Sequence, residues 1–232
     1  MDTPDLRSQR GPHVFVTDLE RPELADDDRH HLSRALRLRN GDPLTLSDGD
    51  GRWRTAVFDE TINDLGPVYE IAPPAHELTL AVALTKAAKP EFAVQKATEI
   101  GIDHMIVFEA EHSVARWDET KRERNQQRLA VIAREAAMQS RQLRVPTVHV
   151  APTLAAALEH CPSTETAVRA DFGGTALTDQ HRFVLIGPEG GWSAYERSVL
   201  PHAVDLGPSV LRAETAAVVA AAKMVGSQAL PT

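Results

Sequence analysis

Two glycine-containing loops hold the residues of this sequence that are best suited to binding a small ligand. The first, Gly187–Gly191 (GPEGG), follows an apolar run and has three glycines in five positions. A backbone without side chains can approach a ligand closely. The start of the helix expected after the loop adds N–H groups that have no partner within that helix. The sequence therefore predicts a loop that holds its ligand through backbone groups.

The second loop, Leu206–Thr215 (LGPSVLRAET), also joins an expected strand to an expected helix. It contains one guanidinium, on Arg212, and one carboxylate, on Glu214. Each loop taken alone could be only a turn made by glycine and proline, and their pairing is what suggests a site.

Other common catalytic and metal-binding motifs are missing from the sequence. It has no G-x-G-x-x-G and no P-loop, and Ser193 lacks the glycine pattern of a nucleophile elbow. Ser193 with Glu196 fits a helix capping box instead. Cys161 is the only cysteine and no two histidines are spaced i, i+4, so we expect no disulfide and no metal site.

The first part of the chain, residues 1–72, reads as a small β-rich domain. One helix, with Asp26–Asp28 at its start and Asn40-Gly41 at its end, interrupts the strands. Pro73-Pro74 marks a domain joint. The expected strands are 13–16, 44–46, 53–58 and 68–71.

After the joint, residues 75–232 alternate between strands and helices. Such alternation predicts a mostly parallel sheet with helices on both faces. Ligands of open α/β sheets bind beyond the carboxyl ends of the strands, where both glycine loops fall. The expected strands are 78–85, 105–108, 145–150, 167–170, 183–186 and 203–206. The expected helices are 90–101, 120–139, 153–160, 193–200 and 214–227.

Composition adds a few limits on location and partners. The net charge of −8 is unusual for a nucleic-acid-binding protein. Basic residues nevertheless concentrate in Arg29–Arg54 and Arg116–Arg144, which suits either an RNA-binding face or solvated helices. No apolar run is long enough for a signal peptide or a membrane span, so we expect a cytoplasmic protein.

Four segments in order resemble the bacterial 16S ribosomal RNA uridine-N3 methyltransferases of the RsmE family, which belong to the SPOUT superfamily. They are HHLSRALRLRNGD, TKAAKPEFAVQKATEIGID, AMQSRQLRVPTV, and the pair IGPEGGWSAYE with LGPSVLRAETAAVVAA. The resemblance implies a PUA-like β-barrel RNA-binding domain in residues 1–72. It also implies a SPOUT domain with a deep trefoil knot in residues 75–232, a homodimer, and 16S rRNA or the small ribosomal subunit as partner.

The resemblance further implies that S-adenosylmethionine binds between the two loops. The implied cofactor contacts are Ile186, Gly187, Pro188, Gly190, Gly191, Leu206, Gly207, Val210, Leu211 and Thr215. The implied RNA contacts are His30, Arg34, Arg37, Lys86, Lys89, Arg141 and Arg144.

Methylation at uridine N3 needs a group that helps the imide to lose its proton. Arg212 is the candidate for stabilising charge on the uracil carbonyls, and Glu214 for accepting the proton or holding Arg212. The two could instead form a structural salt bridge.

The sequence departs from the family pattern at Met138 and at Arg169–Gly174. Three other functions stay open: a SPOUT enzyme with another RNA target, a non-catalytic RNA-binding protein with this fold, and a small-molecule enzyme with an unknotted α/β fold.

Overall fold

The computed structural model describes residues 3–85, 90–161 and 166–227, and the chain divides into two compact units. Unit 1 comprises Met1–Ala75 together with Ala137–Val145, and unit 2 comprises His76–Ala136 together with Pro146–Thr232. The division after residue 75 lies beside the expected proline joint. The return of Ala137–Val145 to unit 1 was not expected from the sequence.

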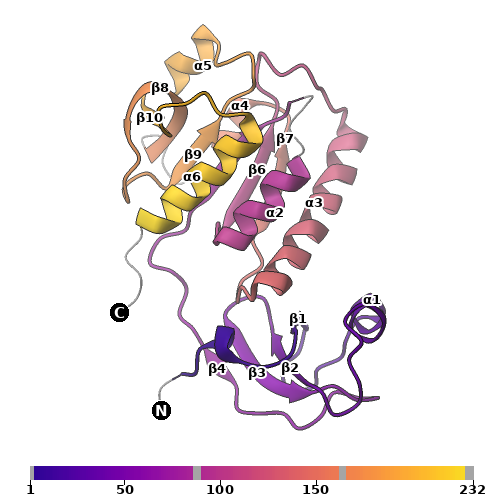
Figure 1. Cartoon of the computed structure of the whole chain (residues 1–232). Helices are drawn as coiled ribbons and strands as arrows, with labels where there is room; N and C mark the ends of the chain where they lie inside the picture. The colour runs from indigo at the N-terminus through magenta and orange to yellow at the C-terminus, as the bar shows by residue number, and fades with distance from the viewer. Residues whose placement is uncertain (1–2, 86–89, 162–165, 228–232) are drawn as a thin grey trace. The chain divides into compact units, whose positions relative to one another are not determined.

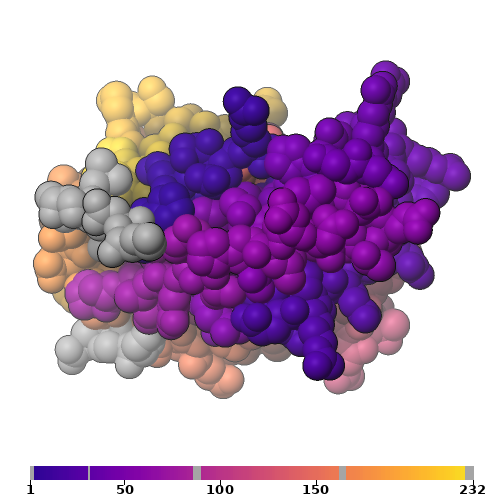
Figure 2. Space-filling model, turned by 90° about the horizontal axis from the view of Figure 1, so that it is seen from below, coloured from indigo at the N-terminus to yellow at the C-terminus, as the bar shows by residue number. Residues whose placement is uncertain are grey.

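Unit 1 is built on a four-stranded sheet in the order β1-β2-β3-β4. β1 is parallel to β2, and the other two pairs are antiparallel. Figure 2 shows one face of the molecule, with this part of the chain in indigo to purple. The elements are η1 (Leu6–Ser8), β1 (His13–Phe15), α1 (Asp26–His30), η2 (His31–Ala35), β2 (Pro43–Ser47), β3 (Arg52–Val57) and β4 (Tyr69–Glu70).

The helix of unit 1 is shorter than the sequence predicted. α1 passes into the π-helical turn η2, and the chain then reverses at Arg37, whose φ is +57°. The Leu38 N–H donates to the Leu32 carbonyl at 3.0 Å, as in a Schellman motif, and the two leucines pack in the core. Leu36, four residues after Leu32 in the sequence, is left 49% exposed.

Unit 2 contains a six-stranded sheet in which every pair is parallel, in the order β10-β8-β9-β5-β6-β7 (Figure 1). Its strands are β5 (Thr79–Ala83), β6 (His104–Phe108), β7 (Thr147–Ala151), β8 (Ala167–Ala176), β9 (Phe183–Ile186) and β10 (Ala203–Asp205). Its helices are α2 (Pro90–Ile100), α3 (Glu119–Ser140, whose last turn belongs to unit 1), α4 (Leu154–Leu158), α5 (Ala194–Val199) and α6 (Ala213–Ser227).

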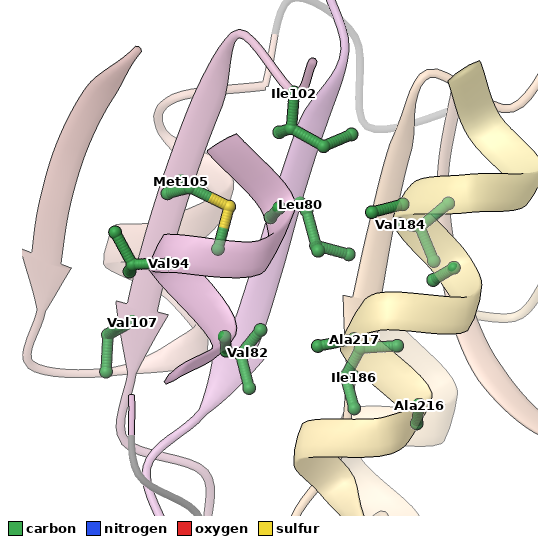
Figure 3. Close-up of a cluster of buried hydrophobic side chains, with 14 of the residues drawn as sticks. Leu80, Val82, Val94, Ile102, Met105, Val107, Val184, Ile186, Ala216 and Ala217 are labelled. Atoms are coloured by element: carbon green, nitrogen blue, oxygen red, sulfur yellow. The ribbon is translucent and has the colours of Figure 1, made fainter. Parts of the chain in front are cut away.

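The sheet is buried on both faces because alternate residues of its strands point to opposite sides. Leu80 and Val82 of β5 pack in a cluster with α2, α3 and α6, as Figure 3 shows for part of it. Ala81 and Ala83 pack on the other side with residues of α4 and with Leu200 after α5. The apolar strands predicted from the sequence are thus the centre of a three-layer unit.

Local signals located most helix starts correctly. Ser193 and Glu196 form the predicted capping box of α5, and Thr153 caps α4. Thr120 and Glu123 have the spacing of a capping box in the sequence, but they do not form the start of α3. Asp118 caps this helix, because its carboxylate accepts from the Lys121 N–H at 2.8 Å.

The alanine-rich face of α6 is used inside unit 2. Ala217, Ala220 and Ala221 are fully buried in the cluster that α6 shares with α2. Small side chains let the two helices approach closely. This packing accounts for the alanines of α6. The trefoil knot itself stays a prediction of the resemblance.

None of the described helices is long and apolar enough to cross a membrane. Within the same described residues, no cluster of three or more histidine, cysteine, aspartate or glutamate side chains could hold a metal ion.

Candidate active site

A cavity of about 390 Å³ lies at the carboxyl ends of β9 and β10, where open α/β sheets bind ligands. Three segments form it: the middle of β8, the loop between β9 and α5, and the loop between β10 and α6. The lining residues are Ala170, Asp171, Phe172, Ile186, Gly187, Pro188, Glu189, Gly191, Trp192, Asp205, Leu206, Gly207, Ser209, Val210, Leu211, Arg212, Ala213 and Ala216.

The contribution of β8 comes from a break in its pairing with β10. Arg169 pairs with Ala203, but the next pair joins Thr175 to Val204. Residues 170–174 therefore bulge out of this ladder, and the bulge carries Asp171 and Phe172 to the cavity. The sequence predicted a strand of only four residues here and missed the bulge.

Asp171 is held by two guanidinium groups. Its carboxylate pairs with Arg197 of α5 and with Arg169, whose Nε lies 3.2 Å away. It also accepts from the Phe172 N–H at 3.1 Å. These contacts stabilise the bulge and leave the Phe172 side chain 62% exposed.

Trp192 joins the bulge to the GPEGG loop. Its Nε1 donates to the Ala170 carbonyl at 3.0 Å, and its ring lies against Gly187. A Cβ at position 187 would come within 2.8 Å of the Trp192 ring carbon Cε2, closer than packed atoms allow. Gly187 is therefore required for packing against Trp192.

Glu196 is a buried carboxylate that holds the chain just after the GPEGG loop. It is 1% exposed, and it accepts from the backbone N–H groups of Ser193 and Glu111, each at 2.9 Å. Glu111 lies on the loop between β6 and α3, so Glu196 ties two loops of unit 2 together.

The second glycine loop presents Arg212 at the cavity. Gly207 has a φ of +145°, which favours glycine, and its N–H donates to the Asp205 carboxylate at 2.8 Å. The Arg212 carbonyl accepts from the Ala216 N–H at 2.8 Å as α6 begins. The Arg212 side chain is exposed and, among the described residues, has no ion pair.

Glu214 does not line the cavity, and no ion pair joins it to Arg212 among the described residues. It lies in the first turn of α6, where the helix dipole stabilises a negative charge. The alternative of a structural Arg212–Glu214 salt bridge is thus not what this structure contains.

Eight of the ten cofactor residues predicted from the sequence line the cavity. The other two, Gly190 and Thr215, do not. Gly190 lies beside His112, whose Cβ would be 3.1 Å from a Cβ at position 190. Thr215 is exposed on the first turn of α6.

Sequence reasoning missed six polar or aromatic lining residues: Asp171, Phe172, Glu189, Trp192, Asp205 and Ser209. Asp205 is the last residue of β10, and Glu189 lies in the loop after β9. Their positions at or just beyond the carboxyl end of a strand were the sequence signal that could have identified them as lining residues. Asp171 and Phe172 fall in the segment where the sequence departs from the family pattern. Gly173-Gly174 was the local signal there, because glycine within a strand often marks a bulge, and Gly173 has a φ of +73°.

The predicted RNA-binding residues fall into three groups. Arg34, Arg37 and His30 are exposed in unit 1. Lys86 and Lys89 lie outside the described residues.

Arg141 and Arg144 already have partners in unit 1. Arg141 donates to the carbonyls of Leu6 at 3.1 Å, Gln9 at 2.9 Å and Gly11. Arg144 donates to the Ile71 carbonyl at 2.7 Å. These bonds give both arginines a structural role.

Comparisons with known proteins agree with this architecture. A family model described as an RNA methyltransferase domain matches residues 72–225, and one described as an RNA methyltransferase PUA domain matches residues 24–60. Unit 2 with its cavity thus corresponds to the methyltransferase domain of this class.

Named relatives narrow the class to one family. Ribosomal RNA small subunit methyltransferase E of Mycobacterium tuberculosis is 31% identical, over 84% of this chain and 82% of the relative. The enzyme of the same name from Rickettsia conorii is 31% identical over 87% and 88%. The chain belongs to the ribosomal RNA small subunit methyltransferase E family.

A solved structure from the family shows a similar fold. It is the Neisseria gonorrhoeae enzyme bound to S-adenosylmethionine, with a TM-score of 0.75 and 26% identity over 93% of this chain and 97% of that one.

Proposed function

We propose that this protein transfers a methyl group from S-adenosylmethionine to N3 of a uridine in the 16S rRNA of the small ribosomal subunit. The observation that carries the proposal is the cavity between the two glycine loops, in a chain of this family. Its lining includes Arg212, which has no ion pair with any other residue that the structure describes. The bound cofactor of the Neisseria gonorrhoeae relative supports the choice of methyl donor.

The cavity fits this cofactor in size and charge. Its volume of about 390 Å³ lies in the range of small-molecule sites. Its lining includes the carboxylates of Glu189 and Asp205, besides Asp171, whose charge Arg169 and Arg197 balance. Carboxylates in the lining suit a ligand with a sulfonium and an ammonium group. The first turn of α6 lines the cavity through Ala213 and Ala216, and its free N–H groups suit the cofactor's carboxylate.

When bound, the cofactor supplies an electrophilic methyl group on a positively charged sulfur. The residues of this chain must then favour the anionic form of the uracil ring. Arg212 can donate two hydrogen bonds from its planar guanidinium to a uracil carbonyl that gains charge as N3 loses its proton. Because Glu214 neither lines the cavity nor forms an ion pair with Arg212, we leave the acceptor of that proton unassigned.

Unit 1 provides the means to hold the RNA. Arg34 and Arg37 are exposed cations that can bind phosphates, and such contacts position the RNA without reading its bases. N3 lies on the pairing edge, so the uridine must be unpaired or flipped when it reacts. A homodimer, implied by the resemblance, stays a prediction that light scattering would test.

A two-part experiment tests the proposal. Calorimetry should detect binding of S-adenosylmethionine, and the protein should transfer a radiolabelled methyl group to unmodified 16S rRNA or to small subunits that contain it. Nuclease digestion and mass spectrometry should place the label on a uracil base. Failure to bind the cofactor, or label on a ribose, would contradict the proposal.

A further inference from the structure

Beside the cofactor cavity lies a second hollow, of about 650 Å³, which the proposed function does not use. It is formed by β8, by the start of β10 and by the turn before β9, all in unit 2. Phe172 borders both spaces, because it lines the second hollow as well as the cavity. The bulge in β8 therefore places one exposed aromatic ring between the two.

The chemistry of the hollow differs from that of the cavity. Among the described residues that line the hollow there is no acidic side chain, whereas three line the cavity. The lining of the hollow includes Arg169, His181, His202 and Gln180. Because Arg169 and Arg197 balance the charge of Asp171 beside it, the hollow repels a phosphate less than the carboxylate-lined cavity does.

The polar groups of the hollow can recognise the edge of a base. His181 Nδ1 lies 2.9 Å from the Thr178 N–H and accepts from it, so a neutral His181 carries its proton on Nε2 as a donor. The Gln180 amide donates to Asp179 at 3.3 Å, and its carbonyl oxygen can accept further bonds. The hollow thus contains a donor on His181, an acceptor on Gln180 and the aromatic ring of Phe172.

We infer that an unpaired nucleotide of the substrate RNA occupies this hollow with its base stacked on Phe172. The inference rests on the proposed function and deepens it, because it assigns a base-binding subsite to the same reaction. Aromatic side chains are common stacking platforms for single-stranded RNA. Asp171, fixed between Arg169 and Arg197, is the positioning residue that holds the bulge.

The test compares Phe172→Ala with Phe172→Tyr, Phe172→Leu and wild type. Loss of the ring should weaken binding of a 16S rRNA fragment by about 5- to 150-fold, the range for one stacked base. Tyrosine should restore affinity, whereas leucine, which is apolar but not aromatic, should not. The salt dependence of binding should keep its slope, because no phosphate contact is lost.

Phe92→Ala is the matched control, since Phe92 is another exposed phenylalanine, 41% accessible on α2, and lines neither space. It should bind RNA like wild type. Turnover at saturating RNA separates two positions for the base. A loss confined to affinity places a neighbouring nucleotide in the hollow, and an added loss of turnover places the target uridine there.

If Phe172→Ala binds and methylates RNA like wild type, the inference is wrong while the proposed function stands. Full rescue by leucine would also overturn it, because apolar bulk rather than stacking would be sufficient. If wild type itself neither binds S-adenosylmethionine nor methylates RNA, the proposed function fails first.

Discussion

The indole ring of Trp192 occupies the space that any side chain at position 187 would need. A Cβ on Gly187 would lie 2.8 Å from Cε2 of that ring, while Nε1 of the same ring donates to the Ala170 carbonyl at 3.0 Å. One aromatic side chain thus sets the distance between the GPEGG loop and the β8 bulge. Both segments line the cavity, so the shape of the cavity depends on Trp192.

Gly187→Ala should therefore damage the cofactor site. The new methyl group must displace Trp192, so we expect cofactor affinity to fall by at least about tenfold, with a loss of stability of about 1–3 kcal/mol from overpacking. Calorimetry and denaturant unfolding would measure both. Gly226→Ala is the control: it adds a methyl group on α6 with no described atom within 4 Å. It should leave cofactor affinity near wild type and leave stability unchanged or slightly raised, because alanine favours the helix over glycine. Unchanged cofactor binding by folded Gly187→Ala would contradict this account of the loop.

Arg212 should act in the chemical step. Its side chain has no ion pair among the described residues, so Arg212→Ala should change the free energy of unfolding little. Turnover at saturating RNA and cofactor should fall about 100- to 1000-fold, the usual cost of losing one donor to a developing anion. Arg212→Lys keeps the charge but loses the planar fork and should remain impaired.

Single-turnover assays with Arg124→Ala, an exposed arginine on α3, provide the control for Arg212. Glu214→Gln should keep most activity, since Glu214 does not line the cavity. Near-normal turnover in Arg212→Ala would remove Arg212 from the mechanism.

The arginines first grouped as RNA contacts should separate into two kinds. Arg34→Ala and Arg37→Ala should weaken RNA binding and reduce the slope of log affinity against log salt by about one each. Arg141→Ala should instead lower the free energy of unfolding by about 2–4 kcal/mol, because three backbone carbonyls lose a charged donor. Salt titrations and denaturant unfolding of the three variants would decide. A stable Arg141→Ala that loses RNA affinity would contradict the structural role.

His13 should make the stability of unit 1 depend on pH. Burial lowers the pKa of His13 to about 4, and its Nδ1 lies 3.0 Å from the Thr45 hydroxyl. The unfolded chain binds the proton below about pH 6.5, whereas the folded unit binds it only near pH 4. The free energy of unfolding should therefore fall as the pH drops from 6.5 to 4, by about 3 kcal/mol, and this group adds nothing above that window.

Denaturant unfolding of wild type and His13→Gln at pH 7.5 and 4.5 tests the pH effect. The variant has no ionisable group at this position, so its stability should change less between the two conditions. Equal pH dependence of the two proteins would show that His13 does not titrate in this way.

The sequence predicted the regular parts of the fold because their signals are local. Apolar runs located the buried strands β5, β6 and β9, and the capping box at Ser193 located α5. The two glycine loops, each of which follows a strand, correctly predicted most of the segments that line the cavity. These features depend on residues within a few positions of one another.

What the sequence could not predict depends on contacts between distant segments. The bulge of residues 170–174 exists because β8 changes register against β10, and it brings Asp171 and Phe172 to the cavity. Arg141 looked like a surface cation, but its partners are carbonyls more than 100 residues earlier in the chain. Basic residues alone cannot distinguish a phosphate contact from such a bond.

The central claim, methylation of one uridine N3 in small-subunit rRNA, is tested most directly by mass-spectrometric mapping of that rRNA in cells with and without the gene. The account predicts that deletion removes one base-methylated uridine, that the wild-type gene restores it, and that Arg212→Ala restores it little or not at all. An unchanged modification map after deletion, or the loss of a ribose methyl group instead, would contradict it.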